Sequence, residues 1–195
     1  MRRYEAVVIG ASAGGLDALK TLLTHLPNDF SLPIAVVLHL HRNTKGELIN
    51  VLQKGTRLNV NYAQDKKRIQ KGYLYIAPPD YHLLIEDDKT LSLSVDEPVN
   101  YSRPSIDVLF ESASDAFREH VIGIILTGAN RDGSMGLKRI KERGGTAIVE
   151  NPQSAEYSEM PLAAIAETQS DYILDVDEIA RKIYELLGGE KCKTF

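Results

Sequence analysis

The sequence predicts a doubly wound α/β fold: a mainly parallel sheet with helices on both faces and one antiparallel β-hairpin. Two observations lead to it. Short apolar runs rich in β-branched residues alternate with segments whose apolar residues recur every three to four positions, and such alternation favours parallel strands joined by helices. Two further apolar runs, at 82–86 and 91–95, flank the turn residues 87–89 and predict the hairpin.

The first third of the chain predicts a β-α-β-α-β order. Its second strand is a continuous apolar run, as expected for a strand covered on both faces, and His39 ends it. The expected elements are a strand at 5–9, a helix at 16–26, a strand at 34–38, a helix at 45–54 and a weak strand at 59–63.

The remaining elements follow from the same patterns. Pro104-Ser105 opens a helix, the most apolar strand leads into a polar loop at 127–133, and Gly144-Gly145 stops the helix after that loop. Besides the hairpin we expect strands at 73–77, 121–126, 146–149 and 172–174, and helices at 105–117, 134–143, 161–167 and 179–187.

Length and composition describe one domain, residues 1–187, followed by a polar tail, 188–195, that we expect to be disordered. At 195 residues and 43% hydrophobic content, the chain suffices for one sizeable core. The net charge of −4 and the dispersed lysines and arginines argue against a nucleic-acid partner. We expect a cytoplasmic protein without membrane insertion, because no run resembles a signal peptide or a spanning segment. The single cysteine, Cys192, lies in the tail and is not a candidate nucleophile.

Ser12 is the first candidate functional residue. It sits in Gly10-Ala11-Ser12-Ala13-Gly14, at the turn from the first strand into the first helix. Glycines on both sides remove Cβ atoms that would clash, so the turn can lift the serine out of the backbone as a nucleophile elbow does. Unpaired N–H groups at the start of the helix could then bind an oxyanion.

Two other interpretations of this turn compete. In a dinucleotide-binding loop Ser12 would take the place of the second glycine and obstruct the pyrophosphate, and no acidic residue closes the second strand. The other is that Ser12 only caps the helix, since serine is a preferred N-cap residue. The turn alone leaves that alternative open.

His39 and Asp132 join Ser12 if their strands are neighbours, because parallel strands gather ligand-binding residues at their carboxyl ends. A histidine can accept the serine proton, and a carboxylate can orient that histidine. We therefore expect Ser12 Oγ about 2.6–3.2 Å from one ring nitrogen of His39 and Asp132 at the other. The competing interpretation of Asp132, just before Gly133 and a helix, is an ordinary cap.

A zinc site is a weaker alternative. His39 and His41 stand two residues apart and could share one side of a strand, with Asp80 and His82 as distant additions. No cysteine or acidic cluster accompanies the pair. We expect no metal and no cofactor, and we interpret His25, His82 and His120 as surface or hydrogen-bonded residues.

With these residues in view, the chain from about Tyr4 to Leu187 resembles the catalytic domain of the CheB protein-glutamate methylesterases. The family's catalytic serine, histidine and aspartate correspond to Ser12, His39 and Asp132. The resemblance is carried by Ile9-Gly10-Ala11-Ser12-Ala13-Gly14-Gly15, His39, Tyr75-Ile76-Ala77-Pro78, Asp80, His82, Arg103-Pro104-Ser105-Ile106-Asp107-Val108-Leu109-Phe110, Ile125-Leu126-Thr127-Gly128, Asp132-Gly133 and Met160-Pro161.

The resemblance implies hydrolysis of glutamate methyl esters on chemoreceptors, with deamidation of glutamine as a further activity of some members. The backbone N–H groups of Ala13 and Ala129 would hold the oxyanion. The implied partner is a methylated chemoreceptor or similar signalling protein. The alternative is a catalytically silent module that binds receptor or acidic peptide segments.

The chain also departs from the family pattern. Many members carry a phosphorylation-dependent receiver domain ahead of the catalytic domain, whereas this sequence starts directly at the catalytic strand. We therefore expect that control to be absent here or supplied by a separate regulator. Ala129 stands where methionine is common, and Asn130-Arg131 replaces a usual glycine-asparagine. Leu38, His41 and Glu159 differ as well. The charged pair of Arg131 and Glu159 at the rim could select a different partner, or it could have no effect on partner choice.

Overall fold

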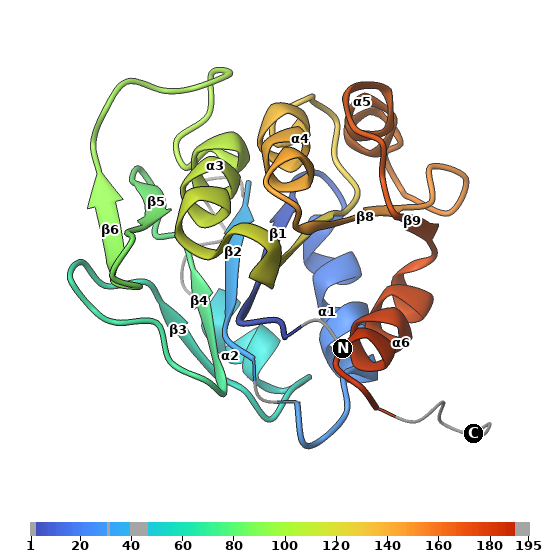
Figure 1. Ribbon diagram of the computed structural model, residues 1–195, viewed down its shortest axis with the longest axis horizontal. Coiled ribbons are helices and arrows are strands. Elements are labelled where there is room, and N and C mark those ends of the chain that lie inside the picture. Colours follow the sequence, from blue (N-terminus) through green and yellow to red (C-terminus); the bar gives the residue numbers. More distant parts are fainter. Residues whose placement is uncertain (1–2, 31, 40–46, 190–195) are drawn as a thin grey trace.

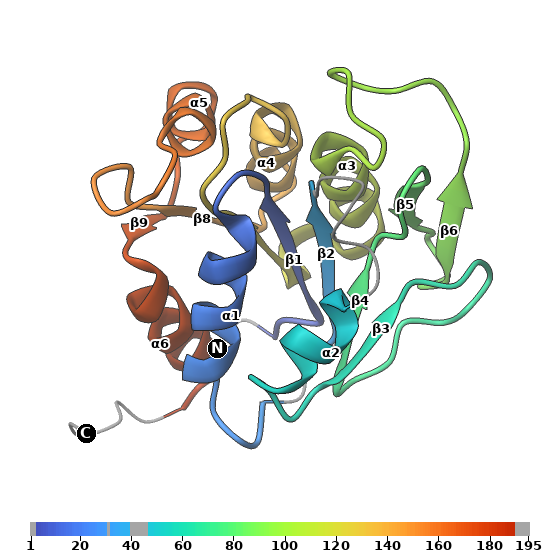
Figure 2. The same cartoon turned by 180° about the vertical axis from the view of Figure 1, so that it is seen from behind.

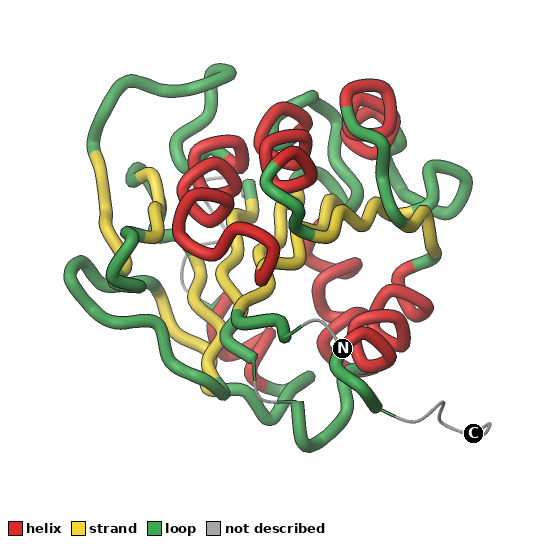
Figure 3. The backbone as a smooth tube through the Cα atoms, viewed as in Figure 1, coloured by secondary structure: helices red, strands yellow, loops and turns green. Residues whose placement is uncertain are grey.

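The computed structural model describes residues 3–30, 32–39 and 47–189, and its centre is a parallel sheet of seven strands. The strand order is β3-β4-β2-β1-β7-β8-β9, and every neighbouring pair is parallel. The strands are β1 (Ala6–Ala11), β2 (Ile34–Leu38), β3 (Asn59–Tyr62), β4 (Tyr73–Ile76), β7 (Val121–Ile125), β8 (Thr146–Glu150) and β9 (Tyr172–Leu174). The predicted sheet is thus confirmed (Figure 3).

In the described part of the chain, three helices pack on each face of the sheet, and the two layers can be followed in Figure 1 and, from behind, in Figure 2. Alternate residues of β1 point to opposite faces, so Val7 and Ile9 join one apolar cluster while Ala6 and Val8 join the other. The helices of the first cluster are α1 (Gly15–His25), α2 (Leu48–Gln53) and α6 (Val176–Leu186), and those of the second are α3 (Ile106–Phe117), α4 (Ser134–Glu142) and α5 (Glu159–Glu167).

The predicted hairpin is also present. Strands β5 (His82–Ile85) and β6 (Leu91–Ser94) pair antiparallel and form a small sheet of their own. Leu83, Ile85 and Leu91 are buried in the same cluster as α3, so the hairpin packs beside that helix at one end of the molecule (Figure 1). A 3₁₀ turn, Arg118–His120, links α3 to β7.

Several predicted helix boundaries were wrong by a few residues. Helix α6 begins at Val176 rather than 179, because Asp175 and Glu178 form a reciprocal capping box. Helix α5 begins at Glu159, which leaves Pro161 in the first turn, where its missing N–H costs no helical bond. The described part of α2 begins at Leu48, and residues 45–46 of that prediction lie outside the described residues.

The sheet order brings together the strands that matter for function. Strand β1 lies between β2 and β7, with Ala11 opposite Leu38 and Gly10 opposite Ile125. Ser12 and His39 therefore follow directly on neighbouring strands, and the loop after β7 runs beside them. Within the described residues, no helix combines the length and apolarity needed to cross a membrane.

Candidate active site

Ser12 lies in the turn between β1 and α1, and it does not cap the helix. The N-cap is Gly14, which has a left-handed φ of 74° and makes no side-chain cap bond. The turn is held by the Ser12 N–H, which donates to the Thr127 carbonyl at 3.0 Å, and by the Gly15 N–H, which donates to the Ser12 carbonyl at 2.8 Å. The capping interpretation of Ser12 is therefore wrong, and its hydroxyl is left for other partners.

The neighbours of His39 define which ring nitrogen carries the proton. Nε2 lies 3.2 Å from Asp132 Oδ2 and 3.1 Å from the Pro104 carbonyl oxygen. Both partners can only accept, so in the neutral ring Nε2 is the N–H and Nδ1 is the basic nitrogen. The predicted contact between Asp132 and the histidine is confirmed.

Asp132 is fully buried, and its carboxylate sits at the N-terminus of α3. It accepts hydrogen bonds from the Ser105 hydroxyl at 2.8 Å and from the backbone N–H groups of Ile106 and Asp107 at 2.6 and 3.2 Å. Burial alone would raise the pKa of Asp132, but the hydrogen bonds from His39, Ile106 and Ser105 outweigh burial and hold this pKa below its usual value.

The suggestion that Asp132 caps the helix that follows it is wrong. Gly133 is the N-cap of α4 and no side chain caps that helix. Asp132 instead caps a helix that comes earlier in the chain, α3, while its N–H binds the side chain of Asn130.

Asn130 is a residue of the site that the sequence pointed to only as a departure from the family pattern. Its Nδ2 donates to Ser12 Oγ at 3.2 Å and lies 3.5 Å from His39 Nδ1, and its Oδ1 accepts the Asp132 N–H at 3.0 Å. Among the hydrogen bonds of the described residues there is none directly between Ser12 and His39. The expected direct bond is replaced by the Asn130 amide, which contacts both groups.

A second carboxylate lies behind the first. Asn100 Nδ2 bridges Asp107 Oδ2 at 2.8 Å and Asp132 Oδ1 at 3.2 Å. Burial, with a further contribution from the charge of Asp132, raises the pKa of Asp107 to about 6, although the Gly136 N–H and Asn100 partly oppose it. Asn100 and the next residue, Tyr101, both have positive φ, so one side chain turns inward to the carboxylates while the tyrosine is fully exposed.

A buried glutamate supports the serine turn from the other side. Glu150, at the end of β8, accepts the Thr127 N–H at 2.7 Å, and Thr127 in turn bonds the Ser12 N–H through its carbonyl and the Ala13 carbonyl through its hydroxyl. Burial raises the pKa of Glu150 to about 6, together with the negative charge of Asp175 and against the Thr127 bond. This network fixes the backbone on both sides of Ser12.

His82 supports the start of α3 and is buried. Its Nδ1 accepts the Ser105 N–H at 3.1 Å and its Nε2 donates to the Glu97 carbonyl at 3.1 Å, so it is a hydrogen-bonded residue as expected. No group of three metal-ligating side chains lies together in the described part of the chain. His41, on which the zinc alternative depends, lies outside the described residues.

The two N–H groups assigned to an oxyanion belong to residues on either side of the Ser12 turn: one follows Ser12 in the chain, and the other lies on the loop after β7. Ala13 follows Ser12 directly. Ala129 follows Gly128, which lies so close to the serine that a Cβ added to it would be 2.9 Å from the Ser12 Cβ. Among the described residues, no acceptor pairs with either N–H. Arg131, on this loop, is exposed, with its Nη2 3.5 Å from Glu167 Oε1.

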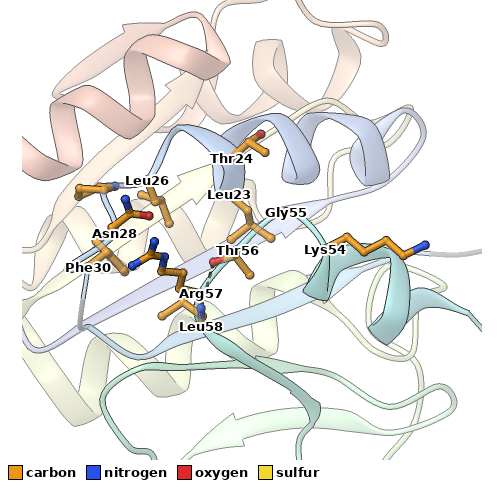
Figure 4. A pocket seen from close by; sticks show the side chains of 11 residues that line it. Leu23, Thr24, Leu26, Asn28, Phe30, Lys54, Gly55, Thr56, Arg57 and Leu58 are labelled. Carbon is orange, nitrogen blue, oxygen red and sulfur yellow. Dashed lines mark hydrogen bonds between the residues drawn. The ribbon is translucent and has the colours of Figure 1, made fainter.

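A cavity of about 240 Å³ lies elsewhere, between the end of α1 and the segment after α2 (Figure 4). Leu23, Phe30 and Leu58 line it together with Lys54 and Arg57. Because α1 runs back from the carboxyl edge of the sheet, its end lies at the opposite edge from Ser12. None of the residues assigned to catalysis lines this cavity.

Fold and site together define the class of this protein: a doubly wound α/β domain that gathers a serine, a histidine and a buried aspartate at the carboxyl ends of its central strands. The CheB methylesterase family model matches residues 7–183. The crystal structure of the Thermotoga maritima CheB methylesterase catalytic domain superposes with a TM-score of 0.88 and 33% identity, covering 94% of this chain and 98% of that one. The chain belongs to the CheB methylesterase family.

Relatives of similar sequence carry two activities in their names. A Leptospira interrogans protein, for which both are proposed, is 51% identical over 183 residues, or 94% of this chain and 95% of that protein. The protein-glutamate methylesterase/protein-glutamine glutaminases of Geobacillus kaustophilus and Clostridium acetobutylicum are 40% and 35% identical over 96% and 95% of this chain. The match covers 55% and 54% of those two proteins.

Proposed function

We propose that this chain is a serine hydrolase that removes methyl esters from glutamate side chains of a methylated chemoreceptor or similar signalling protein. Family membership supports this substrate class, since the relatives are named for it. The observation that carries the mechanism is the position of the buried carboxylate of Asp132, 3.2 Å from His39 Nε2. That contact leaves Nδ1 as the basic nitrogen on the side of Ser12.

In the proposed reaction Ser12 Oγ attacks the γ-carbonyl carbon, and its proton passes to His39 Nδ1. The carbonyl oxygen becomes an oxyanion held by the N–H groups of Ala13 and Ala129. The adduct then loses methoxide, which takes the proton from His39 and leaves as methanol. Water activated by the same nitrogen attacks the acyl-enzyme, which releases the glutamate carboxylic acid and restores the Ser12 hydroxyl.

The same steps would deamidate a glutamine, with ammonia leaving in place of methanol. The relatives' names support this second activity. The single cysteine of the chain suits a reducing compartment, and we propose that the protein acts in the cytoplasm.

The test is methanol release from a recombinant chemoreceptor cytoplasmic fragment that has been methylated with a labelled methyl group. Ser12→Ala should lower the rate by about 10³-fold or more, because the remaining groups cannot form the acyl-enzyme. Ser92→Ala, on β6, is the matched control and should keep the parent rate.

Labelling by a fluorophosphonate separates the hydrolase from the silent binding module. The parent protein should be labelled at Ser12 and the Ser12→Ala variant should not. A parent protein that binds the receptor fragment but neither releases methanol nor reacts with the reagent would instead be the silent module.

A further inference from the structure

We infer that Asn130 is a catalytic residue whose side-chain amide donates a hydrogen bond to the reacting oxygens. The inference deepens the proposed function, because it concerns the same Ser12 site. It adds a side-chain donor to the two backbone N–H groups already assigned to the oxyanion.

The orientation of the Asn130 amide follows from its backbone partner. Its oxygen and nitrogen look alike, so only the hydrogen bonds can tell them apart. The Asp132 N–H can only donate, and it lies 3.0 Å from Oδ1. The opposite end of the amide is therefore the NH₂ group, and that end faces Ser12 Oγ at 3.2 Å and His39 Nδ1 at 3.5 Å.

The donor already contacts the nucleophilic atom. One Asn130 N–H points to a lone pair of Ser12 Oγ, which leaves the hydroxyl proton available for the base. In the tetrahedral adduct, Oγ and the oxyanion are attached to the same carbon atom. A donor that reaches the first of these oxygens can reach the second through a small rotation of the side chain.

The loop that carries Asn130 is held before any substrate arrives. The Gly128 N–H donates to the Tyr157 carbonyl at 3.1 Å, and the Gly128 carbonyl accepts the Met160 N–H at 2.9 Å. Asp132, on the other side of Asn130, is buried and fixed at the start of α3. A donor on such a loop stabilises developing charge without reorganising at the moment of reaction.

The same geometry allows an opposite role, which the experiment must be able to reveal. His39 Nδ1 has one lone pair, and both the Ser12 hydroxyl and the Asn130 amide can donate to it. If Asn130 mainly blocked that lone pair, removing its side chain would raise the rate. If it mainly held the Asp132 N–H, any side chain with an oxygen at that position would suffice.

The experiment compares Asn130→Ala and Asn130→Asp in the full chain, with Asn28→Ala, at an exposed asparagine beside the cavity at the opposite edge of the sheet, as the matched control. Asn130→Asp keeps an acceptor for the Asp132 N–H but loses the donor and adds negative charge beside the oxyanion. We expect kcat for methanol release to fall by about 10²- to 10³-fold in Asn130→Ala, with little change in KM. In Asn130→Asp kcat should fall at least as far, and Asn28→Ala should keep the parent kcat.

Other outcomes overturn the inference. Parent activity or faster turnover in Asn130→Ala would show that the amide is a spacer or a block. Loss in Asn130→Ala with recovery in Asn130→Asp would show that only the support of Asp132 matters.

The rate of fluorophosphonate labelling at Ser12 keeps this inference separate from the methylesterase assignment. A labelled parent that leaves receptor esters intact would contradict the proposed substrate, while slower labelling of both Asn130 variants would still support the donor role. Equal labelling rates in the parent and both variants would contradict that role.

Discussion

The Asp132 carboxylate accepts the backbone N–H of Ile106 at 2.6 Å, which ties the acid of the site to the first turn of α3. The Ser105 hydroxyl and the Asp107 N–H complete this arrangement. Helix N-termini favour negative charge, so the helix stabilises the ionised acid while the acid satisfies N–H groups that lack helical partners. The orientation of His39 and the stability of α3 therefore depend on one side chain.

Asp132→Asn should lower activity and stability together. The amide that replaces the carboxylate loses the negative charge and turns its NH₂ group toward a backbone N–H group, of Ile106 or Asp107, that can only donate. We expect kcat to fall by about 10⁴-fold and the free energy of unfolding to fall by about 1–3 kcal/mol. Urea unfolding at pH 7.5 and methanol release measure the two effects. Asp29→Asn, an exposed control in the loop between α1 and β2, should leave both within error of the parent, and an Asp132→Asn variant as stable as the parent would refute the coupling.

Glu150 should make the protein less stable as pH rises. Its pKa is raised from 4.5 to about 6 in the folded state, so between those values the folded state binds more protons than the unfolded state. Its contribution to the free energy of unfolding should decline by about 2 kcal/mol across that interval. In Glu150→Gln, which keeps an acceptor for the Thr127 N–H, this part of the decline should vanish. Urea titrations at pH 4.5, 5.5 and 6.5 test it, and identical pH profiles for parent and variant would contradict it.

Asn100→Ala should increase the sensitivity of the fold to alkaline conditions. Without the shared amide donor, the carboxylates of Asp107 and Asp132 would face each other unscreened, and the already raised pKa of Asp107 should rise further. An acid whose pKa is raised on folding destabilises the protein above that pKa, so the loss should be greater at pH 8 than at pH 5. Adding Asp107→Asn should restore most of it. The same loss at both pH values would mean that repulsion between the carboxylates is not its cause.

Gly10 and Ile106 should show strong energetic coupling. A Cβ on Gly10 would lie 2.3 Å from Ile106 Cγ2, in a fully buried contact between β1 and α3. Gly10→Ala alone should cost about 1–3 kcal/mol through overpacking. In a double-mutant cycle with Ile106→Ala the two costs should be clearly less than additive, because the smaller side chain makes room for the new methyl group. Additive costs would mean that the clash is relieved elsewhere.

The arrangement of the three polar residues could be predicted because it rests on a rule of topology. Ser12 and His39 each follow an apolar strand, Asp132 lies in the loop after another, and parallel sheets align their carboxyl ends. The sequence alone does not show that β2, β1 and β7 are neighbours. The alternation of strands and helices is nevertheless typical of doubly wound sheets, in which such an order is expected. The resemblance to the methylesterase family selected the same three residues.

The supporting residues were harder to predict, because their partners are far apart in the chain. Nothing in the sequence near Asn100 or His82 indicates that both act on the start of α3. Asn130 was the one local signal, since it stands two residues before the acid on a loop already assigned to the site. The spacing of Asp175 and Glu178 also signalled a capping box, and reading it would have given the correct start of α6.

The opposite orientations of Asn100 and Tyr101 have a consequence for proteolysis. The backbone that brings Asn100 against two buried carboxylates exposes the very next side chain completely to solvent. A protease that cleaves after tyrosine would therefore cut the chain just after Tyr101, next to Asn100, whose side chain supports Asp132. Limited digestion with such a protease should abolish methanol release, while the far-UV circular dichroism spectrum should remain unchanged because the seven-stranded sheet stays folded.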